Sequence, residues 1–263
     1  MTTVNGPETE DFMPDVARPR VRSITVDETS RWLEAGLKDF MAVPGFSLGY
    51  GAMFVLFAYL ITFGLEQIGL GSLSLPFAAG FMLIAPLGAV LFYETSRRIE
   101  QGLYVSFGEA LSSCAAKAAP LGQIGVVLLI VMLAWIMLAL VIFAMFFGGN
   151  PPALDSFFGD VLTAPQAAPF LVVGTLVGGM LATVAFTVSA ISLPMVLDRD
   201  VTAVTAMATS FDAVRKNPRE MLGWGGMIAF ITFSGMVMFF VGLAFSLPLI
   251  GYATWHAYKS LVE

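Results

Sequence analysis

Long apolar runs alternate with shorter polar segments along most of the chain. Five runs lie at about residues 46–65, 73–93, 121–147, 166–193 and 222–240, and a less apolar stretch follows at 242–258. A bilayer core about 30 Å thick needs about 20 apolar residues at a helical rise of about 1.5 Å each. The first four runs meet this length and contain no Asp, Glu, Lys or Arg. The pattern predicts an all-α, polytopic membrane helix bundle.

The basic residues predict how the bundle is oriented. Every Lys and Arg lies before residue 39, within 94–120 or 198–220, or at Lys259, and the connections at 66–72 and 148–165 have none. Positive charge stays on the cytoplasmic side of a membrane. We therefore expect both termini to be cytoplasmic, which requires six transmembrane helices in three hairpins across a bacterial inner membrane. Whether residues 222–258 cross twice or are partly re-entrant stays open.

The segment before the first span divides into two parts. Residues 1–27 are polar and rich in proline, so they are expected to form a disordered cytoplasmic tail. Residues 28–263 form the membrane domain. Within it, apolar side chains recur on one side of residues 29–43, and charged ones, including Asp39, fall largely on the other. This pattern predicts an interfacial helix on the membrane surface.

The two basic connections and three prolines predict structure at the cytoplasmic face. Apolar positions recur at helical spacing in residues 99–114 and 201–214, which is typical of amphipathic surface helices. Pro86, Pro194 and Pro248 lie near the inner ends of the second, fourth and sixth runs. Proline removes a backbone donor and clashes with the preceding turn, so each is expected to bend or loosen its helix.

These bends are expected to surround a cytoplasmic vestibule. We predict that Tyr93, Asp198 and His256 line it. The only histidine lies beside Trp255 and Tyr258, so an aromatic anchor at the membrane interface is the main interpretation of His256, and a ligand or proton-relay role the second.

The fourth run contains a stripe of small and hydroxylated residues. Thr175, Gly179, Thr183 and Thr187 repeat every fourth position. Small residues at this spacing allow helices to pack closely, and threonine hydroxyls bond backwards or across helices. A polar pathway for a small solute uses the same residue types. Packing is favoured because no ionisable group joins the stripe.

Composition excludes several classes of protein. Of the 263 residues, 57% are hydrophobic and 12% are charged, about half the usual share of a soluble domain, which is about 25%. The thirteen basic residues fall into four patches, so a nucleic-acid surface is not expected. One Cys and one His provide neither a disulfide, a tetrahedral metal site nor paired haem ligands. We expect no catalytic residues, no cofactor and no metal.

Several segments carry a resemblance to a known family. They are WLEAGLKDFMAVPGFSLGYG (Trp32–Gly51), LPMVLDRD (Leu193–Asp200), the run from Ala208 to Asn217, and ATWHAY (Ala253–Tyr258). Together they resemble a bacterial inner-membrane family known only as a domain of unknown function, from about residue 28 onward. The resemblance implies six membrane helices and no established activity. Some members are likened to cytochrome c oxidase subunit I, but this chain lacks the histidines of that catalytic subunit.

Two functional hypotheses remain. The first is a non-enzymatic accessory or assembly factor that binds other membrane proteins, because no catalytic constellation is present while surface elements occur at both membrane faces. The alternative is a carrier or binding protein for an uncharged solute or lipid. An enclosed polar cavity beside the stripe in the fourth run would favour the alternative, and a tightly packed seam without lipid would remove it.

Overall fold

The computed structural model describes residues 19–25, 27–149 and 157–263, and its regular elements there are helices, as predicted. One isolated β-bridge joins Val21 to Val262. The elements are α1 (Asp27–Ala42), α2 (Pro44–Gln67), the 3₁₀ turn η1 (Gly71–Leu73), α3 (Ser74–Gly88), α4 (Val90–Glu100), α5 (Phe107–Ala116), α6 (Ala118–Phe147), α7 (Phe157–Thr163), α8 (Ala167–Ser189), α9 (Ser192–Asp198), α10 (Ala203–Lys216), α11 (Pro218–Val237) and α12 (Leu243–Leu261).

Five helical stretches in the described part are long and apolar enough to cross a membrane. They are Pro44–Gln67, Pro76–Glu100, Ala118–Phe147, Ala167–Asp198 and Pro218–Val237. They overlap the first five predicted runs, so the helical structure of these runs is confirmed. The sixth predicted run forms α12, which is 19 residues long but does not join this group. Six crossings in three hairpins therefore stay a prediction.

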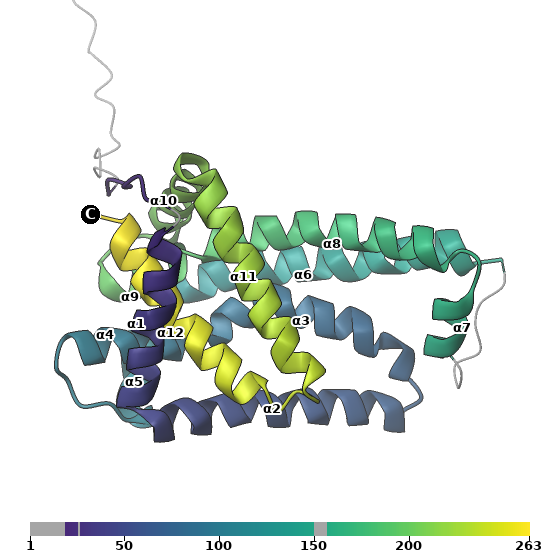
Figure 1. The fold of residues 1–263 in the computed structure, drawn as a ribbon, viewed down its shortest axis with the longest axis horizontal. Helices are drawn as coiled ribbons and strands as arrows, with labels where there is room; N and C mark the ends of the chain where they lie inside the picture. Colours follow the sequence, from purple (N-terminus) through teal and green to yellow (C-terminus); the bar gives the residue numbers. More distant parts are fainter. Residues whose placement is uncertain (1–18, 26, 150–156) are drawn as a thin grey trace, which may run out of the picture.

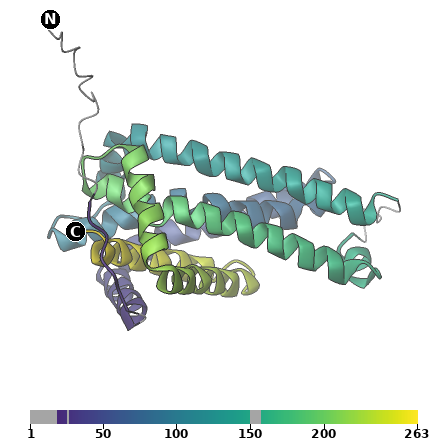
Figure 2. The ribbon, with the colours of Figure 1, turned by 90° about the horizontal axis from the view of Figure 1, so that it is seen from above.

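The bundle has two unlike ends. Helices α2, α3, α6 and α8 follow the long axis, whereas α1 crosses it at the end that also holds α9, α10 and the C-terminus (Figure 1). Helix α7 lies at the opposite end, as the view from above also shows (Figure 2). The predicted amphipathic helix at 201–214 is present as α10, whereas only the second half of the one at 99–114 forms a helix of its own, α5, because α4 extends to Glu100 and a loop follows. The elements that carry most of the charged residues thus gather at one end.

The hairpin of α11 and α12 stops short of the α7 end. The hydroxyl of Tyr59 donates to the carbonyl of Phe239 in the turn, at 2.6 Å. Tyr59 lies eight residues before Gln67, the last residue of α2, so the turn is about 12 Å short of that helix end. Phe239 and Phe240 have positive φ values of 52° and 62°, which bulky residues rarely adopt. The Phe239 side chain is 82% exposed, as suits a turn whose surroundings are lipid.

Helix α1 packs on the bundle through its apolar side. Trp32 is buried and meets Trp224 of α11 edge to face, with ring centroids 5.4 Å apart. Gly36 lies against the backbone of Ala253 in α12, so close that a side chain there would clash. The predicted helix at 29–43 is therefore present. Asp39 corrects the expected charged side, because its carboxylate is buried among polar groups of α4 and α12.

Residues 19–25 correct part of the predicted disordered tail. Val21 pairs with Val262, and the side-chain amide of Asn217 donates to the carbonyl of Arg22 and accepts from the backbone of Ile24. These contacts hold the segment against the C-terminus and the start of α11. The polar composition of residues 19–25 does not predict these contacts, because their partners are far away in the sequence. Residues 1–18 and 26 lie outside the described part.

Two of the three prolines accompany a break in a helix. Helix α3 ends two residues after Pro86, and the carbonyl of Gly88 at that break accepts a hydrogen bond from the hydroxyl of Tyr50, at 2.9 Å. Pro194 lies in α9, just after the break that follows α8. Pro248, by contrast, lies inside α12, which continues through it without a break. The predicted loosening is therefore visible at two positions.

A serine from α10 fills the break between α8 and α9. The hydroxyl of Ser210 donates to the carbonyl of Thr187, at 2.6 Å, and accepts from the backbone N–H of Ile191, at 3.2 Å. In an unbroken helix these two backbone groups would bond to each other, because they are four residues apart. Ser210 is fully buried, so its hydroxyl replaces the missing helical bond where water cannot.

We expect Ser210→Ala to lower the free energy of unfolding by about 1–3 kcal/mol, because it leaves a buried donor and a buried acceptor unsatisfied. Unfolding of the purified protein in mild detergent, followed by tryptophan fluorescence, measures the change. Ser234→Ala is the control, because that exposed hydroxyl bonds only to Phe230 in its own helix. Equal stability of the two variants would contradict the bridging role.

Candidate functional site

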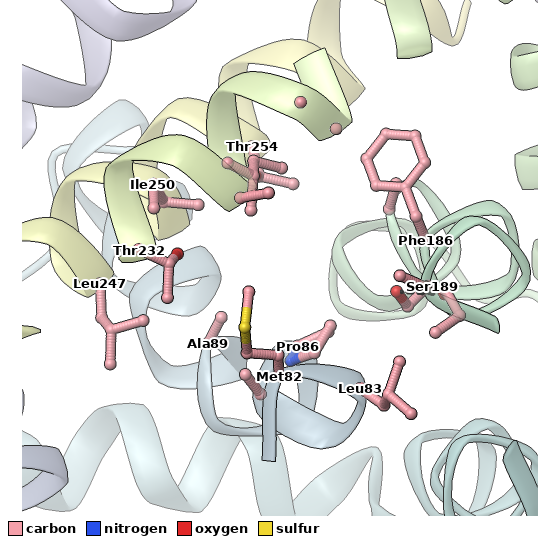
Figure 3. Close-up of a pocket in the computed structure, with 18 of the residues that line it drawn as sticks. Met82, Leu83, Pro86, Ala89, Phe186, Ser189, Thr232, Leu247, Ile250 and Thr254 are labelled. Carbon is pink, nitrogen blue, oxygen red and sulfur yellow. Dashed lines mark hydrogen bonds between the residues drawn. The ribbon is translucent and has the colours of Figure 1, made fainter. Parts of the chain in front are cut away.

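A cavity of about 310 Å³ opens between α3, α4, α8, α11 and α12. Its walls come from four of the five candidate spans and from α12, so the cavity lies at membrane depth. Figure 3 shows side chains of α3 and α8 facing those of α11 and α12 across it. Most lining side chains are apolar, including Phe54, Met82, Leu83, Pro86, Phe92, Phe186, Leu247 and Ile250. None of the described lining residues is Asp, Glu, Lys, Arg or His.

Five hydroxylated residues interrupt this apolar lining. Two of them are engaged, since Thr183 donates to the carbonyl of Gly179 and Ser189 to that of Ala185. The other three are Tyr93, Thr232 and Thr254, each 5% exposed or less. Within the described residues, no protein group accepts or donates a hydrogen bond to these three hydroxyls. The cavity thus combines an apolar wall with three free hydrogen-bonding groups.

The threonine stripe of α8 lies on the surface of the bundle. Thr175, Gly179 and Thr183 are exposed, and Thr187 is half-buried. The hydroxyls of Thr183 and Thr187 donate to carbonyls one turn earlier, at 2.8 and 2.7 Å. Thr183 is the member of the stripe that also lines the cavity. A role for the stripe in packing or as a polar pathway stays a prediction.

His256 belongs to a small polar cluster on three helices. Its Nε2 lies 2.8 Å from Oδ2 of Asp39 on α1, and the hydroxyl of Ser96 on α4 donates to the same oxygen, at 2.6 Å. Because one carboxylate binds both groups, the cluster joins the first helix, the fourth and the last. Nothing in the sequence pattern of residues 29–43 marks Asp39 as buried.

Asp198 lies in a second cluster, on another side of α12. Its Oδ2 accepts from the hydroxyl of Tyr258 at 2.7 Å and from Lys259 at 3.3 Å. Arg199 donates to the same tyrosine oxygen, at 3.0 Å. The three residues predicted to line one vestibule thus have different surroundings: the cavity for Tyr93, and separate clusters for Asp198 and His256. The shared vestibule stays a prediction.

A third cluster buries charge near the C-terminal end of the second candidate span. Arg97 donates two hydrogen bonds to the Glu94 carboxylate, at 2.7 and 2.9 Å, and Arg98 lies 3.6 Å from it. Arg98 also bonds Glu109 of α5 and the carbonyl of Tyr104. The Glu94 side chain is 1% exposed, so its charge is balanced by arginine instead of water. This arrangement fixes α4 to α5.

The only cysteine is a structural residue. Cys114 is buried on α5, and burial together with the charge of Glu94 raises the pKa of its thiol to about 12. A thiol that stays protonated at neutral pH is a poor nucleophile.

Sequence reasoning found one of the three free hydroxyls. Tyr93 was noticed because it ends an apolar run just before charged residues. Thr232 and Thr254 lie in different runs, and no spacing along the chain relates them to each other or to Tyr93. Only the packing of α11 and α12 against α3 and α8 brings all three to one cavity. A threonine that does not bond to its own helix is visible only in a structure.

Comparison with known proteins agrees with the membrane assignment. No curated protein and no solved structure matches the chain. Residues 74–198, from α3 to α9, match the family model DUF2189, described as a predicted integral membrane protein. The match includes Leu193–Asp198, part of one motif that carried the resemblance to an uncharacterised membrane family. The helical stretches and this match together indicate a multi-pass integral membrane protein, in which residues 74–198 are similar to DUF2189, a domain of unknown function.

Proposed function

We propose that this protein binds an uncharged, largely apolar molecule taken from the bilayer, as a non-enzymatic binding protein or carrier. The observation that supports this function is the cavity of about 310 Å³ at membrane depth, whose volume is at the lower end of ligand pockets, about 300–1,000 Å³. Its lining has hydroxyls but no Asp, Glu, Lys, Arg or His. Such a lining favours neutral ligands, because an ion there would lose its hydration without a counter-charge.

A photoreactive diacylglycerol tests this function in nanodiscs of neutral phospholipid. We expect irradiation to label peptides of α3, α8, α11 or α12 that line the cavity, as mapped by mass spectrometry. Gly225→Leu should abolish the labelling, because Gly225 lines the cavity and a Cβ there would meet the ring of Phe186 at 3.7 Å. Gly223→Leu is the matched control, since Gly223 faces open space on the same helix. Labelling confined to the outer surface of the bundle would contradict the proposal.

The role of an accessory or assembly factor is a second candidate. An exposed apolar and aromatic surface at the charged end supports it, formed by Leu103, Tyr104, Phe107 and Leu111. Copurification in gentle detergent, compared with a Tyr104→Ser/Phe107→Ser variant, tests this role. Recovery of the same proteins with both variants would count against it.

We also propose that this charged end is cytoplasmic and that the membrane is a bacterial inner membrane. Arg97, Arg98 and the basic residues of α10 all lie there. Reporter enzymes fused after residues 105, 210 and 263 should all report the cytoplasmic side, and a reporter at 155 the outside. An external residue 263 would contradict this orientation.

A further inference from the structure

The three free hydroxyls have a definite place in the cavity. They come from three helices, Tyr93 from α4, Thr232 from α11 and Thr254 from α12, and all three residues line the cavity. Thr232 and Thr254 lie on the same side of the cavity as Leu247, and Met82 and Pro86 lie on the facing side (Figure 3).

A hydroxyl that faces an apolar cavity without a protein partner is unfavourable, so its presence needs an explanation. Threonine in a helix commonly donates to the carbonyl four residues earlier. Thr183 does so beside this same cavity, and several other helical hydroxyls do so too. Thr232 and Thr254 do not, although both are nearly fully buried. Their hydroxyls are thus available to a molecule in the cavity.

We infer that Tyr93, Thr232 and Thr254 bind the oxygen-bearing head of a neutral lipid, with a carbonyl or hydroxyl oxygen as the recognised group. This inference rests on the proposed function and specifies its ligand. A hydroxyl both donates and accepts, so each of these oxygen types can be satisfied. A phosphate or carboxylate head would lack a counter-charge among the lining residues.

The size of the cavity limits which part of the lipid it holds. A volume of about 310 Å³ equals the share of about ten water molecules in the liquid, each about 30 Å³. A head and the first part of one chain fill such a space. The rest of the lipid lies along the apolar wall and passes between helices into the bilayer. Acylglycerols, prenyl alcohols and quinones share this chemistry.

Three photoreactive probes of similar chain length test the inference in the full-length protein in nanodiscs. The first is a diacylglycerol, the second a prenyl alcohol, and the third an alkane without oxygen. We expect the two oxygen-bearing probes to label cavity peptides at least tenfold more efficiently than the alkane. The diacylglycerol and the prenyl alcohol are also compared with each other. The one that labels at the lower concentration shows whether the bound lipid is of the acyl or the prenyl class.

Isosteric variants test the three hydroxyls individually. Tyr93→Phe, Thr232→Val and Thr254→Val should each weaken labelling by the oxygen-bearing probes by about 2- to 12-fold, the range expected for one hydrogen bond. Labelling by the alkane should not change. Thr187→Val is the matched control, because its hydroxyl is bonded to the carbonyl of Thr183 and does not line the cavity, so it should not alter the preference. Without lipid, the Thr232 and Thr254 variants should unfold at the same or a higher temperature, because they remove an unpartnered hydroxyl.

The outcomes separate this inference from the proposed function. If the alkane labels the cavity as efficiently as the other probes, the role of the hydroxyls is wrong and the apolar binding function stands. If the three variants keep the full preference for oxygen, the inference is also wrong. If no probe labels the cavity of the unaltered protein, both proposals fail.

Discussion

Glu94→Ala is expected to lower the free energy of unfolding by about 3–5 kcal/mol, the cost of removing one partner from a buried ion pair. Arg97 would lose both of its hydrogen bonds to the carboxylate, and Arg98 would lose its nearest charge within α4. Both guanidinium groups stay charged at any accessible pH, so neither can avoid the penalty by losing its proton. Chemical unfolding of the purified protein in mixed detergent micelles measures the loss.

Two other variants show whether buried charge is the cause. Glu94→Gln keeps the shape and one oxygen acceptor but removes the charge, so we expect an intermediate loss. Glu34→Gln should change stability by less than about 1 kcal/mol, because the Glu34 side chain is 67% exposed and pairs with Lys38 at the surface. A Glu94→Ala protein as stable as the Glu34 variant would show that the arginines find new partners.

Gly51→Ala is expected to destabilise the protein by about 1–3 kcal/mol or more, the usual cost of overpacking. A Cβ at this position would overlap the carbonyl oxygen of Ala244 and lie 2.9 Å from two further backbone atoms of that residue. Backbone atoms cannot turn away as a flexible side chain can. This carbonyl is also the one to which Pro248 cannot donate a helical hydrogen bond, because proline lacks an N–H. The glycine thus lets α2 approach α12 at its proline.

Gly49→Ala is the matched control on the same helix, two residues earlier. A Cβ there meets nothing within 4 Å, so alanine should be neutral or should stabilise by up to about 1 kcal/mol through its higher helix propensity. The two substitutions are chemically identical and differ in the expected sign. Thermal unfolding in one detergent compares them directly, and a shift of the same sign for both would contradict the close contact between α2 and α12.

The apolar pattern predicted most of the fold because hydropathy measures what a bilayer requires. Each of the five long runs became a helix of membrane-spanning length. The turn at Phe239 is the hard case, since it has no polar residue and the residues with positive φ in it are Phe239 and Phe240, whereas its glycine, Gly242, comes at its end. A turn surrounded by lipid needs its backbone groups satisfied, and here Tyr59 of α2 contributes. That partner lies 180 residues away in the sequence.

The candidate site was less predictable than the fold for a related reason. Asp39 was assigned to the solvent side of its helix by periodicity, but His256 and Ser96 compensate its burial from two other helices. The sequence does not distinguish Thr232 and Thr254 from other threonines, because single threonines are common in apolar helices, where they usually bond to their own backbone. The properties that distinguish these residues are relations between distant segments, which one sequence does not contain.

The contact between α1 and α12 has a consequence for biosynthesis. Gly36 and Asp39 of the first helix meet Ala253 and His256 of the last one, and Trp32 meets Trp224 nearby. A ribosome releases these partners in order, so α1 emerges long before α12 exists. The apolar face of α1 has no partner on α12 until almost the whole chain has been translated. Until then, lipid or a chaperone must cover it. Chains truncated before residue 243 would therefore expose that face, a simple mark by which quality-control proteases could recognise unfinished molecules.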